Sequence, residues 1–215
     1  MAEKFTLKRG LSNIYGAFVT KDNNETDGGY TAGTPFHLIP AGELSIAVDA
    51  EKANVWFDNA VFAALGREGN SEMEITGASL REKIKAELNG KYVDPATGII
   101  LDDGGYHETY LAIGGTMHNL DGTTVNFWFL KGTVTPFDEA GKTEDESTDY
   151  NGDTIKYSAQ KTIHKFDYPD NTKKPCKRVI MDSSTTKLVD SQSWEAQVVT
   201  PENLATICAK ITETA

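Results

Sequence analysis

The chain has 215 residues, a length typical of a single domain. Its 32 acidic and 21 basic residues give a formal net charge of −11, the opposite of the positive charge with which proteins hold nucleic-acid phosphates. No apolar run approaches the roughly 20 residues of a membrane span, and the first ten residues contain no signal-peptide core, so we expect a soluble, cytoplasmic chain.

An antiparallel sheet is predicted from short runs in which apolar and polar residues alternate. Residues 126–130 are apolar on both faces, which predicts a strand at the centre of the sheet, buried either within the domain or against a partner. The other predicted strands lie at residues 11–20, 44–48, 72–76, 107–113, 155–160 and 178–181, and the central strand extends over residues 125–134.

Two helices are predicted from their end signals. Ser79 and Glu82 have the spacing of a capping box, and Gly90 supplies a left-handed stop, so a short helix should cover one face or end of the sheet. Thr200 followed by Pro201 predicts the start of a short amphipathic helix at the C-terminus. The predicted fold class is therefore α+β, mainly antiparallel β, with helices as covers.

No motif in the sequence gives positive support for an enzyme. Residues 141–143 (Gly-Lys-Thr) lack the earlier glycine of a phosphate-binding loop. Residues 22–28 begin like a calcium loop without its Gly and Glu, so we interpret them as a solvated turn, with weak calcium contact as the alternative. The four histidines lack zinc-ligand spacing, and Cys176 and Cys208 are predicted to be free thiols. We expect no catalytic residue, metal or cofactor.

Residues 138–153 hold seven acidic residues and a single lysine, a composition that indicates a solvated loop. In residues 128–147 an aromatic strand runs into Lys-Gly, then a Pro with acidic residues, then Lys-Thr and more acidic residues. This stretch resembles a pattern in the major tail (tail tube) proteins of siphophages, the long-tailed phages, that infect Gram-positive bacteria. Residues 10–20, followed by a turn that ends in Thr34-Pro35, are similar to the first strand of that family. The resemblance spans residues 8–180 in order and spacing, without residues 54–67.

The resemblance implies a viral tail tube protein. Its expected fold is a β-sandwich or half-barrel with one flanking helix over residues 1–182, followed by a C-terminal extension with a short helix over residues 183–215. Copies of the chain would self-assemble into homohexameric rings, and stacked rings would conduct the genome during ejection. Further implied partners are a tape measure protein, a tail terminator and a distal tail protein. DNA would pass without specific binding, no membrane would be involved, and the protein would lie in the virion, after assembly in the host cytoplasm.

Two sets of residues are candidates for that role. Residues 43–62 are predicted to form a long loop that docks on the next ring, or alternatively a satellite core, because apolar residues gather there. The candidates in this loop are Val55, Trp56, Phe57, Val61 and Phe62. Carboxylates that face the bore would withhold the affinity that Lys or Arg would give to phosphates. The candidate acids are Glu72, Glu74, Glu144, Glu146 and Asp149.

Two other classes of protein stay open at this point. A carbohydrate-binding β-sandwich would use Trp56, Trp128 and Trp194 as a stacking platform. A hydrolase on a β-scaffold would need a pocket with clustered carboxylates of perturbed pKa.

Overall fold

Strands dominate the structure, a computed structural model that describes residues 5–24, 29–57, 60–137, 152–190 and 193–211, with the backbone alone for residues 51–65 and 67. The fold is α+β and mainly antiparallel β, as predicted. The elements are β1 (Lys8–Asn23), β2 (Gly29–Ala32), β3 (Phe36–His37), β4 (Ala41–Phe57), β5 (Ala60–Gly77), α1 (Glu82–Leu88), β6 (Tyr92–Val93), β7 (Ile100–Leu101), β8 (Tyr110–Asn119), β9 (Thr124–Val134), β10 (Asp153–Ala159), β11 (Lys165–Asp167), β12 (Lys173–Pro175), β13 (Arg178–Asp182), β14 (Thr186–Leu188), α2 (Ser193–Ala196), α3 (Leu204–Ile207) and β15 (Cys208–Lys210).

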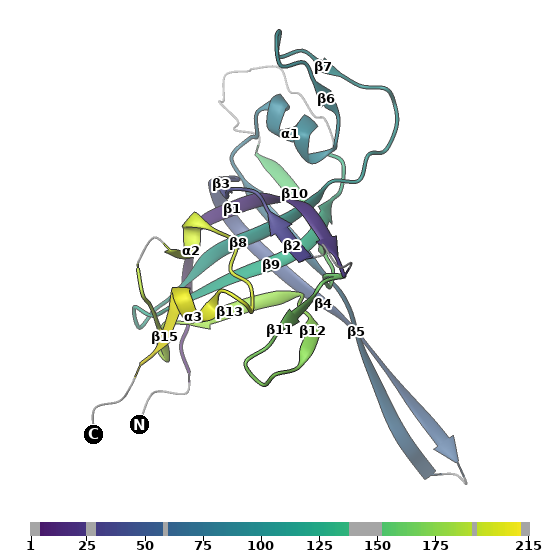
Figure 1. The fold of residues 1–215 in the computed structure, drawn as a ribbon, viewed down its shortest axis with the longest axis vertical. Helices are drawn as coiled ribbons and strands as arrows, with labels where there is room; N and C mark the ends of the chain where they lie inside the picture. The colour runs from purple at the N-terminus through teal and green to yellow at the C-terminus, as the bar shows by residue number, and fades with distance from the viewer. Residues whose placement is uncertain (1–4, 25–28, 58–59, 138–151, 191–192, 212–215) are drawn as a thin grey trace, which may run out of the picture.

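One large sheet organises the molecule, in the order β2-β1-β8-β9-β10-β5-β4, with β3 paired to β1 and β13 paired to β9 (Figure 1). All of its pairings are antiparallel. Strand β9 pairs with β8 along one edge and with β13 and then β10 along the other. This position confirms the prediction that residues 125–134 form the central strand.

Strand β9 separates two apolar cores, which explains why it is buried on both faces. Phe127 and Phe129 point into a core that also contains Ile75 of β5 and Leu88 of α1. The alternate side chains, such as Trp128, point into a second core closed by residues from β11, β13 and the C-terminal segment. Both covers belong to this chain, so the buried strand needs no partner to account for it.

Helix α1 begins differently from the prediction. The capping box at Ser79 and Glu82 is wrong, because no side-chain capping bond forms and the N-cap position is Arg81. Instead Asp153 of β10 accepts hydrogen bonds from the Leu80 backbone N–H (2.6 Å) and the Ser79 hydroxyl (3.1 Å). A carboxylate from a neighbouring strand therefore holds the segment that leads into the helix, and it also pairs with Lys85 of α1 (3.1 Å). The predicted stop is confirmed, since Gly90 has φ +68°.

The predicted C-terminal helix is also wrong in extent. Helix α3 has only four residues, and the chain then turns into β15, which pairs with β14. Asn203, rather than Thr200, occupies the N-cap position, and its side chain bonds the backbone at Thr200 and Val198. Residues 208–210 therefore form a strand paired with β14 in place of the predicted helix. Helices α2 and α3 lie over the β13 side of the sheet (Figure 1).

Candidate functional site

The long hairpin formed by β4 and β5 corrects the prediction of a loop at residues 43–62. The strands pair from Ala41–Gly77 out to Phe57–Ala60. Strand β4 has 17 residues, which at about 3.3 Å per residue is about 55 Å. The hairpin leaves the body of the molecule as a narrow ribbon (Figure 1). Alternating polar and apolar residues in 44–48 predicted the base of this hairpin, but not its continuation.

Two parts of the hairpin have different surroundings. Near the body, β10 pairs with β5 over Ser71–Gly77 and makes a three-stranded sheet. Beyond the Ala50–Glu68 pair, the two strands pair only with each other in the described part of the chain. We call this outer part the distal ribbon. It extends from residue 50 to residue 68 and is a two-stranded structure.

The five predicted docking residues all lie in the distal ribbon. Val55, Trp56 and Phe57 are the last residues of β4, and Val61 and Phe62 lie at the start of β5. Trp56 is in register with Val61. Ten of the 13 residues from 53 to 65 are apolar in sequence, which is an unusual composition for a two-stranded ribbon. The structure describes only the backbone of residues 53–65, so the satellite core stays open as the alternative.

The predicted bore-facing acids fall into two groups. Glu72 and Glu74 are exposed on β5 and alternate with buried Ser71, Met73 and Ile75. Glu144, Glu146 and Asp149 lie outside the described residues. The structure therefore brings Glu72 and Glu74 to one face of the hairpin base, as the period of two predicted.

Small and polar residues surround this acidic pair. Ser158 of β10 is opposite Glu72 and donates to its carboxylate (2.7 Å). Ser45 and Ala47 of β4 are the partners on the other side. Lys156 is in register with Glu74, so the face also contains one cation. The exposed face of β4, β5 and β10 is thus polar and moderately acidic around Glu72 and Glu74.

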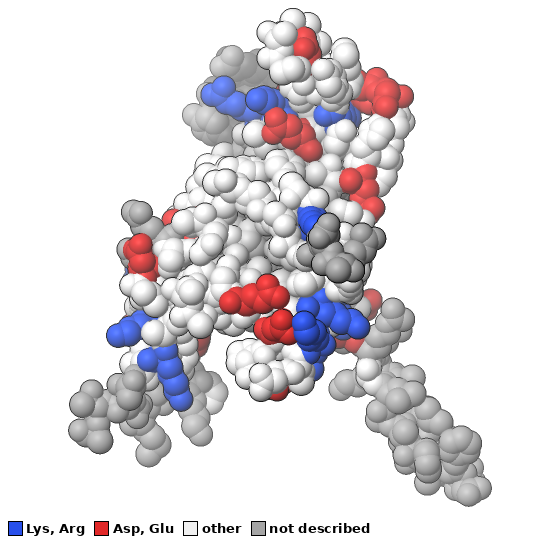
Figure 2. All heavy atoms as spheres, in the orientation of Figure 1, with Lys and Arg blue, Asp and Glu red and all other residues white. Residues whose placement is uncertain are grey.

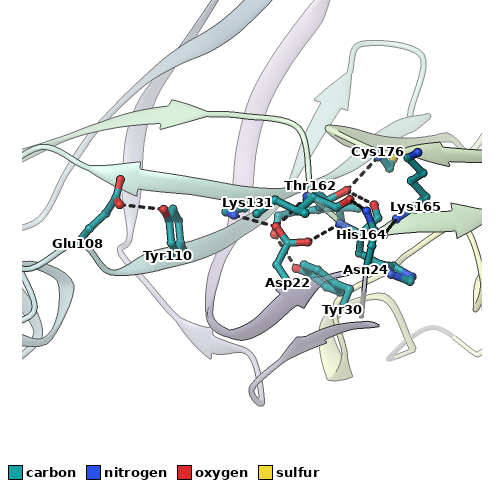
Figure 3. A network of polar contacts seen from close by, with 12 residues as sticks. Asp22, Asn24, Tyr30, Glu108, Tyr110, Lys131, Thr162, His164, Lys165 and Cys176 are labelled. Carbon is teal, nitrogen blue, oxygen red and sulfur yellow. Dashed lines mark hydrogen bonds and ion pairs between the residues drawn. The ribbon is translucent and has the colours of Figure 1, made fainter. Parts of the chain in front are cut away.

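A buried ion pair joins the end of β1 to β9 (Figure 3). The Lys131 ammonium of β9 lies 2.8 Å from the Asp22 carboxylate at the end of β1, and their side chains are 5% and 4% exposed. The backbone N–H groups of Ile163 and His164 also donate to Asp22. The ammonium lies 4.1 Å from the centre of the Tyr110 ring. Asp22 therefore joins three distant segments of the chain.

Burial alone would raise the pKa of the Asp22 carboxyl, but the backbone N–H groups of His164 and Ile163 and the Lys131 ammonium outweigh it and lower the pKa below its ordinary value. Asn24 extends the network, since its amide donates to the Ile163 carbonyl and accepts from the Lys165 backbone N–H. The prediction of a solvated turn at residues 22–28 is therefore wrong for Asp22. A lone lysine inside the apolar run 127–134 was the signal in the sequence for a buried carboxylate partner.

The described residues contain few groups suited to catalysis. Ser12 lies 2.7 Å from His118, but the hydrogen bonds of His118 include no carboxylate among the described residues. A serine–histidine pair without an orienting acid is an incomplete nucleophilic site. The described residues also contain no group of three side chains that could hold a metal ion. Cys176 and Cys208 are free thiols, and burial raises the pKa of both.

Two of the three tryptophans cannot form a stacking platform. Trp128 and Trp194 are 1% and 3% exposed and lie in the second core. The Trp128 indole N–H donates to the Trp194 carbonyl (3.0 Å). These residues therefore contribute to the core and are unavailable to a carbohydrate ring at the surface.

Comparison of the chain with family models and with curated protein sequences gave no match. None of the helices in the described residues is long and apolar enough to cross a membrane.

Proposed function

We propose that this chain is a structural subunit of a siphophage tail tube, in which six copies form a ring and stacked rings conduct the genome. The distal ribbon carries the proposal. A two-stranded ribbon is marginally stable in water unless a third strand or another surface covers it. Since β10 accompanies only the base of the hairpin, a second copy that covers the distal ribbon would supply the missing packing.

The edge of the sheet supports the same proposal. In the described part of the chain β4 pairs with β5 alone, so its other edge presents a row of backbone N–H and C=O groups. Such an edge readily pairs with another chain. A contact between different surfaces of identical subunits closes into a ring when the rotation between them is suitable.

The acidic face at the base of the hairpin suits a bore through which DNA passes. Glu72 and Glu74 repel phosphates, whereas Lys or Arg would bind them. At physiological salt this repulsion extends about 8 Å, which keeps phosphates off the wall without closing a wide channel. The role of these two acids is therefore to prevent adhesion.

The proposal is tested with the purified full-length protein. Sedimentation velocity over a range of concentrations, together with negative-stain microscopy, should reveal rings and hollow filaments. A protein that stays monomeric at every concentration and ionic strength would contradict the proposed function.

A further inference from the structure

Two separate surfaces of the molecule differ in charge. The end formed by α1, β6 and β7 lies at the top of Figure 1, and the β11–β12 hairpin lies in the lower half. Figure 2 shows acidic side chains along one side of the upper end, basic side chains on the part formed by α1, and a group of basic side chains over β12. An overall charge of −11 therefore conceals a basic region.

The upper surface combines exposed apolar side chains with carboxylates. Tyr92 and Leu101 are cross-strand partners in β6 and β7 and are 60% and 57% exposed, and Tyr106 in the following loop is 66% exposed. Large exposed apolar side chains that lie next to each other, as Tyr92 and Leu101 do, indicate an interaction site. Residues 91–108 contain four acidic residues and one lysine, a net charge of −3. We call this region the acidic end; its carboxylates are Asp94, Asp102, Asp103 and Glu108.

Contacts within the acidic end leave most of this charge in place. Lys91 pairs with Asp102 at 2.6 Å, whereas Asp103 is bonded by His107 and the Gly105 backbone N–H. The pKa values of Asp102 and Asp103 are lowered, chiefly by hydrogen bonds from Lys91 and the Gly105 N–H respectively. These groups are therefore ionised at neutral pH.

The lower surface has the opposite charge. Residues 161–178 contain six basic and two acidic residues, a net charge of +4. Ile163 is 57% exposed and lies in sequence between exposed Lys161 and Lys165. Lys177 is ion-paired with Glu68 of β5, which lowers the net charge of the region to +3. We call this region the basic face; its cations are Lys161, Lys165, Lys173, Lys174, Lys177 and Arg178.

We propose that the acidic end of one copy docks on the basic face of the next copy along the tube, with Tyr92, Leu101 and Tyr106 covered in the contact. This inference rests on the proposed function and identifies the surfaces that stack. Because the two surfaces differ, the contact is heterologous and repeats along an axis. Two acidic ends repel each other, so the charges also fix one polarity for the stack.

The test is a charge exchange in the full-length chain. Asp103→Lys with Glu108→Lys makes the upper end basic, and Lys161→Glu with Lys165→Glu makes the lower face acidic. Each double variant should raise the protein concentration needed for filaments by about tenfold or more, because like charges then face each other. The variant with all four changes restores opposite charges and should recover filaments. Circular dichroism and the melting temperature report whether each variant folds.

A matched control, Lys187→Glu with Lys210→Glu, makes the same charge change on exposed positions of β14 and β15 and should leave assembly unchanged. If the upper double variant does not fold, Tyr106→Ser replaces it and should weaken filaments without a change of charge. Folded double variants that assemble like the wild type, or a folded four-change variant without recovery, would overturn the inference.

Three further outcomes separate this inference from others. If the basic face binds nucleic acid instead, Lys161→Glu with Lys165→Glu abolishes binding of a DNA duplex in a mobility-shift assay, while the upper double variant assembles normally; this result overturns the inference. A wild-type protein that forms no rings or filaments contradicts the proposed function itself. Rings that form normally but whose stacking ignores these charges contradict only the inference.

Discussion

At the scale of single residues, we expect the largest effect on the free energy of unfolding from the buried pair formed by Asp22 and Lys131. Asp22→Asn leaves the Lys131 ammonium buried without its carboxylate, which should lower the free energy of unfolding by about 3–5 kcal/mol. Lys131→Met should cost less, because the backbone N–H groups of Ile163 and His164 still bond Asp22. Urea unfolding of both single variants and the double variant measures their coupling. Additive effects would contradict a direct interaction.

The same pair predicts a pH dependence. Because the pKa of Asp22 is lowered in the folded protein, its contribution to stability is complete well above the unfolded value of about 3.9 and is lost as the pH falls through the folded pKa. The difference in unfolding free energy between wild type and Asp22→Asn should therefore shrink as the pH is lowered from about 6 towards 3. Urea titrations at several pH values measure this difference. A constant difference would show that the charge of Asp22 is unimportant.

A glycine next to Trp128 gives a second test at this scale. A Cβ added at Gly114 of β8 would lie 2.5 Å from the Trp128 ring, whose surroundings are fully packed. Gly114→Ala should therefore lower stability by about 1–3 kcal/mol through overpacking. Gly10→Ala in the neighbouring strand is the control, since nothing lies within 4 Å of its added Cβ. Equal melting temperatures for the two variants would show that the side chains around Trp128 can shift to accept the added methyl group without loss of stability.

Single residues also show what sequence patterns can reveal. The apolar run at residues 126–130 predicted a strand buried on both faces, and the structure confirms it. Lys131 directly follows this run, but its partner Asp22 is 109 positions away in sequence. Local periodicity has no information about such a distant pair, so the network around Asp22 could not be predicted from it.

At the scale of elements, the distal ribbon is the part whose role is easiest to isolate. Trp56→Lys with Phe57→Glu should leave a folded subunit that no longer assembles, because charges replace apolar residues at the end of a ribbon that we expect to dock on another copy. Circular dichroism and sedimentation velocity check these two properties. An unfolded product would support the alternative of a satellite core.

The control for this experiment lies elsewhere on the surface. Val189→Lys with Ile211→Glu replaces two exposed apolar residues near the C-terminus and should leave assembly unchanged. Loss of assembly in the control as well would mean that any added surface charge disturbs the rings. The loss of assembly in the variant Trp56→Lys with Phe57→Glu would then not identify the distal ribbon as the contact.

Elements differ in how far the sequence predicts them. Strand β10, which has a regular period of two, and strand β9, which is apolar on both faces, lie close to their expected positions. The start of α1 and the C-terminal helix do not, because tertiary partners outweigh short-range signals. Asp153 bonds Ser79 and Leu80 just before α1, and β14 pairs with residues expected to be helical. The hairpin was expected as a loop, since residues 53–65 are apolar without regular alternation.

At the scale of the whole molecule, the distribution of charge is more informative about function than the formal net charge of −11. The basic face, the acidic end and the polar face at the hairpin base are separate regions, and each has a different task in the proposed tube. A net charge alone would predict solubility and weak binding to DNA. The separation of charges adds a polarity to the subunit, which a stack of identical rings requires.

The role of Glu72 and Glu74 can be tested in the assembled tube. Because Lys releases counterions from DNA and binds its phosphates, Glu72→Lys with Glu74→Lys should produce tubes that form normally but hold the passing genome. In a phage that carries the change, triggered DNA release should slow, and the delay should diminish as the salt concentration rises. The matched variant Glu72→Gln with Glu74→Gln removes the charge without adding a cation and should slow release much less. Unchanged release in the Lys variant, with intact tubes by microscopy, would show that these acids do not face the bore.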